Sequence, residues 1–155
     1  MKKNKYKKSA EITINLQIQA LKKLKKKIGV SFDQAVKTIG DCKSKCILVG
    51  VGKSGHLANL IAASLSSVGA SSFALSASDA AHGDLGVIST LPQKKDVLIL
   101  ISNSGSSSEL NSIISYSKKH NIKLIGITSK KNSTLYKAAN IKILVPEVQE
   151  AGIGG

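Results

Sequence analysis

The sequence has no arginine and no tryptophan, and its 155 residues include only two cysteines, two prolines, three tyrosines and two phenylalanines. With so few aromatic rings, the core must be built from Ile, Leu, Val and Ala. Cys42 and Cys46 have no second Cys or His pair to complete a metal site, so the sequence indicates neither a disulfide framework nor a zinc site. Cys46 opens a strand-like run, where we expect it to be a small core residue. An ordinary apolar core must therefore hold the fold together.

Long apolar runs are also missing. No run approaches the roughly 18–20 residues that a membrane-spanning helix needs. The basic start of the chain, MKKNKYKK, is not followed by the apolar segment of a signal peptide. We therefore expect a cytoplasmic protein that does not engage a membrane.

The net charge of +14 is unevenly distributed. Residues 1–27 hold ten lysines and one acid, Glu11, for a net charge of +9, whereas residues 28–155 carry only +5. The absence of arginine matters because arginine is preferred for bidentate contacts with phosphates and bases. Charge alone attracts nucleic acid weakly and without specificity. The pattern favours a mildly basic domain with a lysine-rich front end over a nucleic-acid-binding protein.

Short apolar runs rich in β-branched residues alternate with helix-like segments through most of the chain. Buried parallel strands have this composition, and the alternation predicts a three-layer α/β fold with a five-stranded parallel sheet flanked by helices, in Rossmann-like or flavodoxin-like winding. In such sheets ligands bind beyond the carboxyl ends of the strands. The stretch 76–91 reads as loop with one helical turn. The expected strands lie at 46–49, 73–75, 97–101, 124–127 and 141–145, and the helices between them at 56–68, 108–120 and 133–139.

Helical patterns precede the sheet, and a short tail follows it. Apolar spacing predicts a first helix over 9–28, and the capping box Ser31–Gln34 predicts a second that ends near Gly40. The tail PEVQEAGIGG has no helical pattern, so we expect either a partner subunit to cover part of the sheet or a shortened version of a longer protein. The predicted organisation is a flexible lysine-rich segment over 1–8 and one domain over 9–155, with helices over 9–40, the sheet core over 45–145 and the tail over 146–155.

A glycine-rich stretch, LVGVGKSGH, follows the first expected strand. Its glycines fit the G-x-G-x-x-G pattern of dinucleotide-binding domains. That fingerprint also needs an acid at the end of the second strand to hold the ribose, and Ser76 stands there. A P-loop for ATP would need glycine at position 47, which is Ile47 inside the strand. Both nucleotide interpretations are weakened, that for ATP more than that for a dinucleotide.

A serine-rich stretch, ISNSGSSSEL, follows the most apolar strand and opens a helix. Hydroxyl and backbone N–H groups at a helix N-terminus favour an anion. A solvated turn with a good helix cap is the common alternative. Two loops suited to phosphate on adjacent strands favour a shared phosphate site, with Lys53 left to face the rest of a small molecule.

Three motifs together, VGVGKSGH, AAHGDLG and ISNSGSSSEL, resemble the sugar isomerase (SIS) domains, and more narrowly the arabinose-5-phosphate isomerases. The resemblance runs from about Cys46 to Ala151. It implies a five-stranded parallel sheet between helices. It also implies interconversion of ribulose 5-phosphate and arabinose 5-phosphate for outer-membrane or capsule sugar (Kdo) synthesis, without a cofactor, by a homotetramer or homodimer.

The resemblance also assigns residues to the site. Aldose–ketose isomerisation through an enediol(ate) needs a base, an acid, and a cation or donors for the developing oxyanion. Glu109 or Glu150 is the candidate base, Lys53 the electrostatic stabiliser, and His82 the acid or a hydroxyl ligand; the choice between the two glutamates stays open. The residues expected to bind substrate are Gly52, Ser54, Gly69, Ala70, His82, Ser102, Asn103, Ser104 and Ser107.

The sequence departs from the family pattern at several points. Ser106 replaces an acid that is usual in the serine-rich stretch. Ser76 stands where some members have a metal-binding histidine, so we expect no metal by that route. The segment that supplies a final helix and a further catalytically important histidine is missing, as are the CBS domains of many members. A non-catalytic phosphosugar-binding module or regulator is therefore the alternative to an enzyme.

Overall fold

A computed structural model describes residues 4–81 and 83–148 of the chain. Contacts divide the chain into two compact units, one of residues 29–144 and one of residues 1–28 with 145–155. The two units are described separately, and the single domain expected over 9–155 stays a prediction. None of the helices in the described ranges combines the length and the apolar composition that a membrane crossing requires.

The first unit contains one long helix, α1, which spans Lys5–Lys25. It begins earlier than the expected residue 9, so part of the lysine-rich segment expected to be flexible is helical. Lysine is a good helix former, and Lys7 lies 3.9 Å from Glu11 one turn along the helix. The last turn is basic, which suits the partial negative charge at a helix C-terminus.

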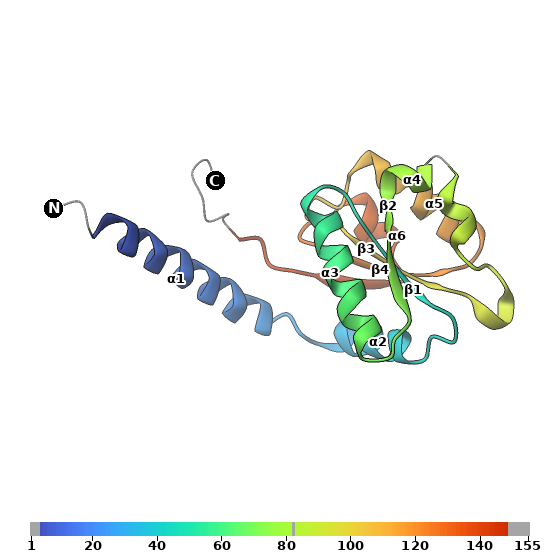
Figure 1. Ribbon diagram of the computed structural model, residues 1–155, viewed down its shortest axis with the longest axis horizontal. Helices are drawn as coiled ribbons and strands as arrows, with labels where there is room; N and C mark the ends of the chain where they lie inside the picture. The colour runs from blue at the N-terminus through green and yellow to red at the C-terminus, as the bar shows by residue number, and fades with distance from the viewer. Residues whose placement is uncertain (1–3, 82, 149–155) are drawn as a thin grey trace. The chain divides into compact units, whose positions relative to one another are not determined.

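The second unit is built on a five-stranded parallel sheet in the order β2-β1-β3-β4-β5 (Figure 1). This confirms the fold class predicted from the alternating apolar runs. The strands are β1 Cys46–Gly50, β2 Ser72–Ser76, β3 Val97–Ile101, β4 Lys123–Thr128 and β5 Ile141–Leu144.

Helices cover both faces of this sheet. Alternate residues of each strand point to opposite faces, so both faces carry apolar side chains that helices bury. Ile47 and Val49 of β1 pack in one core cluster with α4, α5 and α6, whereas Cys46 and Leu48 pack in the other with α2 and α3. The helices are α2 Val30–Gly40, α3 Lys53–Ser67, α4 Ala77–Ala81, α5 Asn111–Lys119 and α6 Thr134–Ala138; three short 3₁₀ turns are η1 Asp84–Val87, η2 Pro92–Lys94 and η3 Ser108–Leu110.

In the second unit, α2 and α3 also begin at residues other than those expected. The capping box was the wrong start for α2, which begins at Val30; the carbonyl of Gly29 accepts the first amide bonds, and Ser31 lies inside the helix. α3 begins at Lys53 rather than at residue 56, because Gly52 adopts a positive φ of 55° and ends the turn early. The earlier start places Lys53 in the first turn of a helix.

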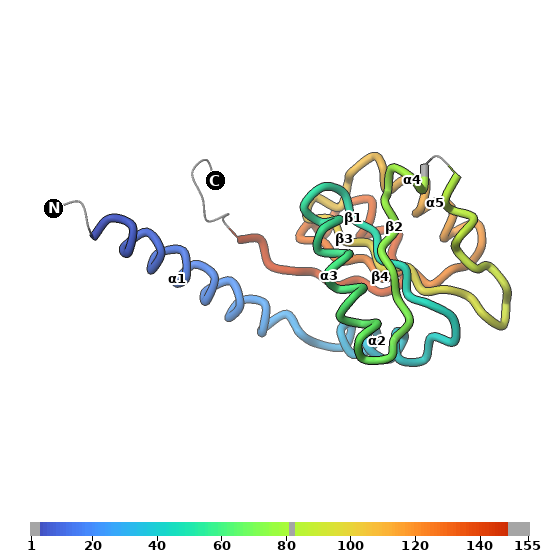
Figure 2. Tube along the Cα trace, in the orientation of Figure 1, coloured from blue at the N-terminus to red at the C-terminus, as the bar shows by residue number. Residues whose placement is uncertain are grey.

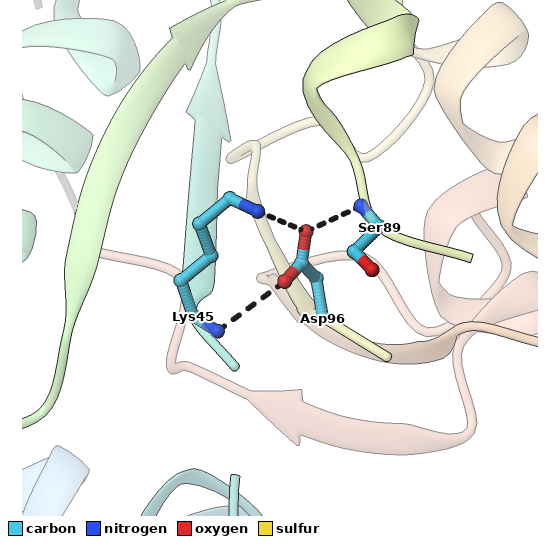
Figure 3. A network of polar contacts seen from close by, with 3 residues as sticks. All are labelled: Lys45, Ser89 and Asp96. Atoms are coloured by element: carbon cyan, nitrogen blue, oxygen red, sulfur yellow. Dashed lines mark hydrogen bonds and ion pairs between the residues drawn. The ribbon is translucent and has the colours of Figure 1, made fainter. Parts of the chain in front are cut away.

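A buried carboxylate joins three segments at the amino edge of the sheet (Figure 3). Asp96 directly precedes β3, and its side chain is 0% exposed. Its Oδ2 accepts from Lys45 Nζ at 2.8 Å and from Ser89 N at 2.7 Å, and its Oδ1 accepts from Lys45 N at 3.2 Å. The carboxylate therefore fixes the start of β1 and the end of the segment between β2 and β3.

Replacing Asp96 with asparagine is expected to destabilise the domain. The amide keeps the size but not the charge, so the Lys45 ammonium loses its ion pair at a site where its side chain is only 29% exposed. Breaking a buried ion pair from one side costs about 3 kcal/mol, which lowers the melting temperature by about 10 °C. Asp41→Asn is the matched control, because the Asp41–Lys37 pair is exposed. Equal melting temperatures for the two variants would contradict the role given to Asp96.

Candidate functional site

The register of the sheet brings the predicted loops to one edge. Gly50 at the end of β1 pairs with Ser76 of β2 and with Ile101 of β3, and Ile101 pairs in turn with Ile127 of β4. Because the strands are parallel, the chain leaves all four at the same carboxyl edge. The glycine turn after β1 and the serine loop (residues 102–107) after β3 therefore lie side by side, as predicted.

The glycine turn joins β1 to α3 at close range. A Cβ atom on Gly50 would overlap the Ser54 carbonyl group and lie 2.8 Å from the nitrogen of Gly55. Gly52 takes the positive φ that completes the turn. The fold therefore needs glycine at these two positions, Gly50 for close strand–helix packing and Gly52 for its backbone conformation, whether or not a nucleotide binds. The result is that Lys53 and Ser54 open a helix at the carboxyl edge.

Lys53 is exposed at the first position of the 15-residue helix α3. The N-terminus of a helix carries partial positive charge, so a lysine is unfavourable there for the helix itself. Lys53 thus places a cation at a helix N-terminus, an arrangement that suits an anionic ligand or an oxyanion. Ser54 follows it and is half-buried.

The serine loop curls around one buried hydroxyl. Ser102 is 5% exposed, and its Oγ accepts from Gly105 N at 3.0 Å. The hydroxyls of Ser104 and Ser107 lie 3.5 and 3.4 Å from the same Oγ. Gly105, with a φ of 63°, makes this tight curl possible. Three hydroxyls gathered in one short loop form a candidate cradle for an anion, with Asn103 exposed beside them.

Glu109 lies in η3, immediately after the serine loop. The predicted helix over 108–120 opens with this 3₁₀ turn before α5 begins. Glu109 is exposed, and Ser108 Oγ donates to its Oε2 at 3.2 Å. α4 packs against η3 and against α5, beside which it lies in the figures (Figures 1 and 2). α4 therefore packs beside the turn that carries Glu109.

Some predicted site residues are not brought to this edge. Gly69 and Ala70 lie at the opposite, amino edge, between α3 and β2. Gly69 has a φ of 90°, and Ala70 N donates to Leu65 O at 3.0 Å, which is the pattern of a helix C-cap. Within one chain the two residues thus end α3, and their contact with substrate stays a prediction. His82 and Glu150 lie outside the described residues.

A hollow of about 720 Å³ also lies at the amino edge, and it includes none of the carboxyl-edge residues. Several lysines line it, and the fold accounts for them. Helices of a parallel α/β domain end at this edge, and their last carbonyls favour cations. Lys95 Nζ, for example, donates to the carbonyls of His120 and Asn121 at 3.2 and 3.3 Å. Despite its size, this hollow is not the candidate site.

Metal or thiol chemistry finds little support in the described parts of the chain. Within residues 4–81 and 83–148, no three His, Cys, Asp or Glu side chains gather into a group that could hold a metal ion. Cys42 and Cys46 are free thiols. Burial raises the pKa of Cys46 to about 12, so that its thiol stays protonated near neutral pH and is a poor nucleophile.

One group of residues was missed at the sequence level. The stretch over 128–133, at the carboxyl end of β4, was given no role from the sequence. Thr128, Ser129 and Ser133 in this loop are buried polar residues. The signal was the hydroxyl-rich run TSKKNST at the end of an apolar strand, since Ser and Thr hydroxyls readily bond to backbone groups.

The parallel sheet with helices on both faces defines a doubly wound α/β domain. At the carboxyl edge of this sheet, the serine loop after β3 is a candidate phosphate-binding loop. The family model of the SIS domain matches residues 39–155. The chain therefore belongs to the SIS domain family.

Known relatives support a narrower comparison. The chain is 39% identical over 136 residues to the arabinose 5-phosphate isomerase KdsD of Shigella flexneri, which covers 88% of this chain and 40% of that protein. It is 40% identical over 152 residues to an uncharacterised protein of Rickettsia prowazekii, covering 98% of this chain and 46% of the relative. The chain thus spans less than half the length of these relatives. A solved structure from Escherichia coli CFT073, in complex with arabinose 5-phosphate, matches 98% of this chain and 79% of its own, with a TM-score of 0.89 and 30% identity.

Proposed function

We propose that this chain is an aldose–ketose isomerase domain that interconverts D-ribulose 5-phosphate and D-arabinose 5-phosphate. The observation that carries the proposal is the serine loop, curled around the Ser102 hydroxyl next to the N-terminus of α3. The relatives support the substrate class, because one is named for this reaction and one structure contains arabinose 5-phosphate. A role in making the outer-membrane or capsule sugar Kdo belongs to the same proposal.

The phosphate would bind at the serine loop. Ser104 and Ser107 offer hydroxyls, and Ser54 adds one from the first turn of α3. The partial positive charge of that helix N-terminus favours the phosphate further. With the phosphate held there, the sugar carbons would extend toward Lys53.

The proton transfer would occur at the sugar carbons. A base removes the proton from C1 or C2, and the developing enediolate oxygen needs a nearby cation. Lys53 supplies the cation, either Glu109 or Glu150 acts as the base, and His82 protonates or binds an oxygen. Because Lys53 and Glu109 are exposed in one chain, we propose that a second copy of the chain covers the site in a homo-oligomer.

Ser104→Ala is expected chiefly to weaken binding, because it removes one donor to the phosphate and leaves the catalytic groups in place. The loss of one hydrogen bond to a charged group predicts a dissociation constant about tenfold higher. Isothermal titration calorimetry with arabinose 5-phosphate measures this dissociation constant. Ser115→Ala is the matched control, since Ser115 is exposed on α5 outside the site. Equal affinities for the two variants would contradict the placement of the phosphate.

Incubation of the purified chain with ribulose 5-phosphate, followed by NMR, tests the proposed reaction. The proposal predicts that signals of arabinose 5-phosphate appear. If the chain binds the phosphosugar without converting it, the enzyme proposal is wrong and the alternative of a phosphosugar-binding module or regulator holds.

A further inference from the structure

The loop over residues 128–133, called here the anchor loop, holds the backbone of the serine loop. The carbonyl of Asn103 accepts three hydrogen bonds from it: from Thr128 Oγ1 at 3.1 Å, from Ser129 N at 3.2 Å and from Ser129 Oγ at 2.9 Å. A carbonyl oxygen has two lone pairs, so this one is fully occupied. The backbone of the serine loop is thereby fixed just before Ser104.

Gly105 is a second point of attachment. Its carbonyl accepts from Leu135 N of α6 at 2.9 Å. Its α-carbon lies so close to the anchor loop that a Cβ atom would be 2.6 Å from Thr128 Oγ1 and would overlap the Ser133 hydroxyl. Ser104, whose hydroxyl is proposed to bind the phosphate, thus stands between two fixed residues.

Thr128 contributes a hydrogen bond to the first attachment and lies close to the second, at Gly105. It is the last residue of β4 and is 1% exposed. Its hydroxyl donates to Asn103 O and accepts from Lys130 N at 3.2 Å, so both of its hydrogen-bonding capacities are used inside the protein. Because this hydroxyl is buried and already hydrogen-bonded inside the protein, any effect on a ligand must pass through the serine loop that it contacts.

We propose that Thr128 is a positioning residue that keeps the serine loop in its phosphate-binding shape. This inference rests on the proposed function, because it assumes that the serine loop binds the phosphate of the substrate. The predicted consequence is a change in phosphosugar affinity that exceeds any change in the chemical step.

Thr128→Val is the main test, because valine keeps the shape of threonine and removes the hydroxyl. The Asn103 carbonyl then loses one donor and Lys130 N loses its acceptor. We expect the KM and the dissociation constant for arabinose 5-phosphate to rise about five- to tenfold, the effect of one lost buried hydrogen bond, with kcat changed less than about twofold. Hydrogen exchange at the Gly105 and Leu135 amides should become faster.

Two further variants separate positioning from general damage. Thr128→Ser retains the hydroxyl and is expected to restore near-normal affinity. Thr134→Val makes the same chemical change at an exposed position of α6 and should leave affinity unchanged. If Thr128→Val does not fold, Ser129→Ala takes its place, because it removes another of the three donors to the Asn103 carbonyl, with an expected rise of about two- to fivefold.

The outcomes distinguish this inference from the proposed function. If the wild-type chain binds arabinose 5-phosphate and the hydroxyl-deleted variant binds it equally well, the positioning role is wrong and the proposed function stands. If Thr128→Ser binds as weakly as Thr128→Val, packing rather than the hydroxyl is responsible, and the inference is again overturned. If the wild-type chain does not bind the phosphosugar, the proposed function fails first, and the positioning role falls with it.

Discussion

Lys53→Ala is expected to reduce isomerase turnover by at least about a hundredfold while the domain stays folded. Removal of a group that stabilises a developing oxyanion typically costs a factor of 10² to 10³ in rate. Lys53 is exposed at the first residue of α3, where its charge opposes the partial positive charge of the helix N-terminus. Because Lys53 is exposed and not part of the apolar core, we expect the melting temperature to stay within a few degrees of wild type.

A lysine at the other end of a helix provides the matched control. Lys119 is exposed in the last turn of α5, where a cation is favourable. Lys119→Ala should lower stability slightly and leave turnover unchanged, the opposite pattern to Lys53→Ala. Steady-state rates with ribulose 5-phosphate and melting curves by circular dichroism measure both quantities. Near-normal turnover of Lys53→Ala would contradict the role of the glycine turn in delivering a catalytic lysine.

Glu109→Gln is the second variant with a large expected effect. If Glu109 is the base, turnover should fall by about 10² to 10⁴, the range attributed to a positioned general base. Glutamine keeps the length of the side chain, and its amide oxygen can still accept the hydrogen bond that Ser108 Oγ donates at 3.2 Å. The fold and the phosphosugar affinity should therefore change little, which separates a chemical from a structural effect.

The same experiment on Glu150 resolves the choice between the two glutamates. Glu150→Gln should retain turnover if Glu109 is the base, and the reverse pattern would assign the base to Glu150. Glu109→Gln with near-normal turnover would remove Glu109 from the catalytic groups. Single-turnover rates are the appropriate readout, because they exclude effects on product release.

The centre of the sheet was predictable because β1 and β3 are buried along their whole length. Such strands appear in the sequence as continuous apolar runs, and VLILI coincides with β3 at both ends. Helix starts were less predictable, because backbone conformation decides them. The Ser31 hydroxyl matched a capping pattern, but the carbonyl of Gly29 accepts the first amide bonds. The positive φ of Gly52, which starts α3 at Lys53, has no counterpart in apolar periodicity.

The meeting of the glycine turn and the serine loop was also predictable, because parallel strands bring the loops at their carboxyl ends to one edge. The contribution of Thr128 was not. It depends on a hydrogen bond to a carbonyl 25 residues earlier, which forms only once β3 and β4 are in register. The role of Gly69 in ending α3 was missed for a different reason, because it depends on a local backbone conformation that motif matching does not report.

The central claim, that this chain moves a proton between C1 and C2 of a pentose 5-phosphate, is tested most directly in D₂O. The chain is incubated with ribulose 5-phosphate, and the sugar phosphates are followed by ¹H and ²H NMR, with Lys53→Ala as the inactive control. The account predicts that arabinose 5-phosphate forms and that its C2 carries deuterium, because an enediolate is reprotonated from a base that exchanges with solvent. Phosphosugar binding without conversion and without deuterium incorporation would contradict it.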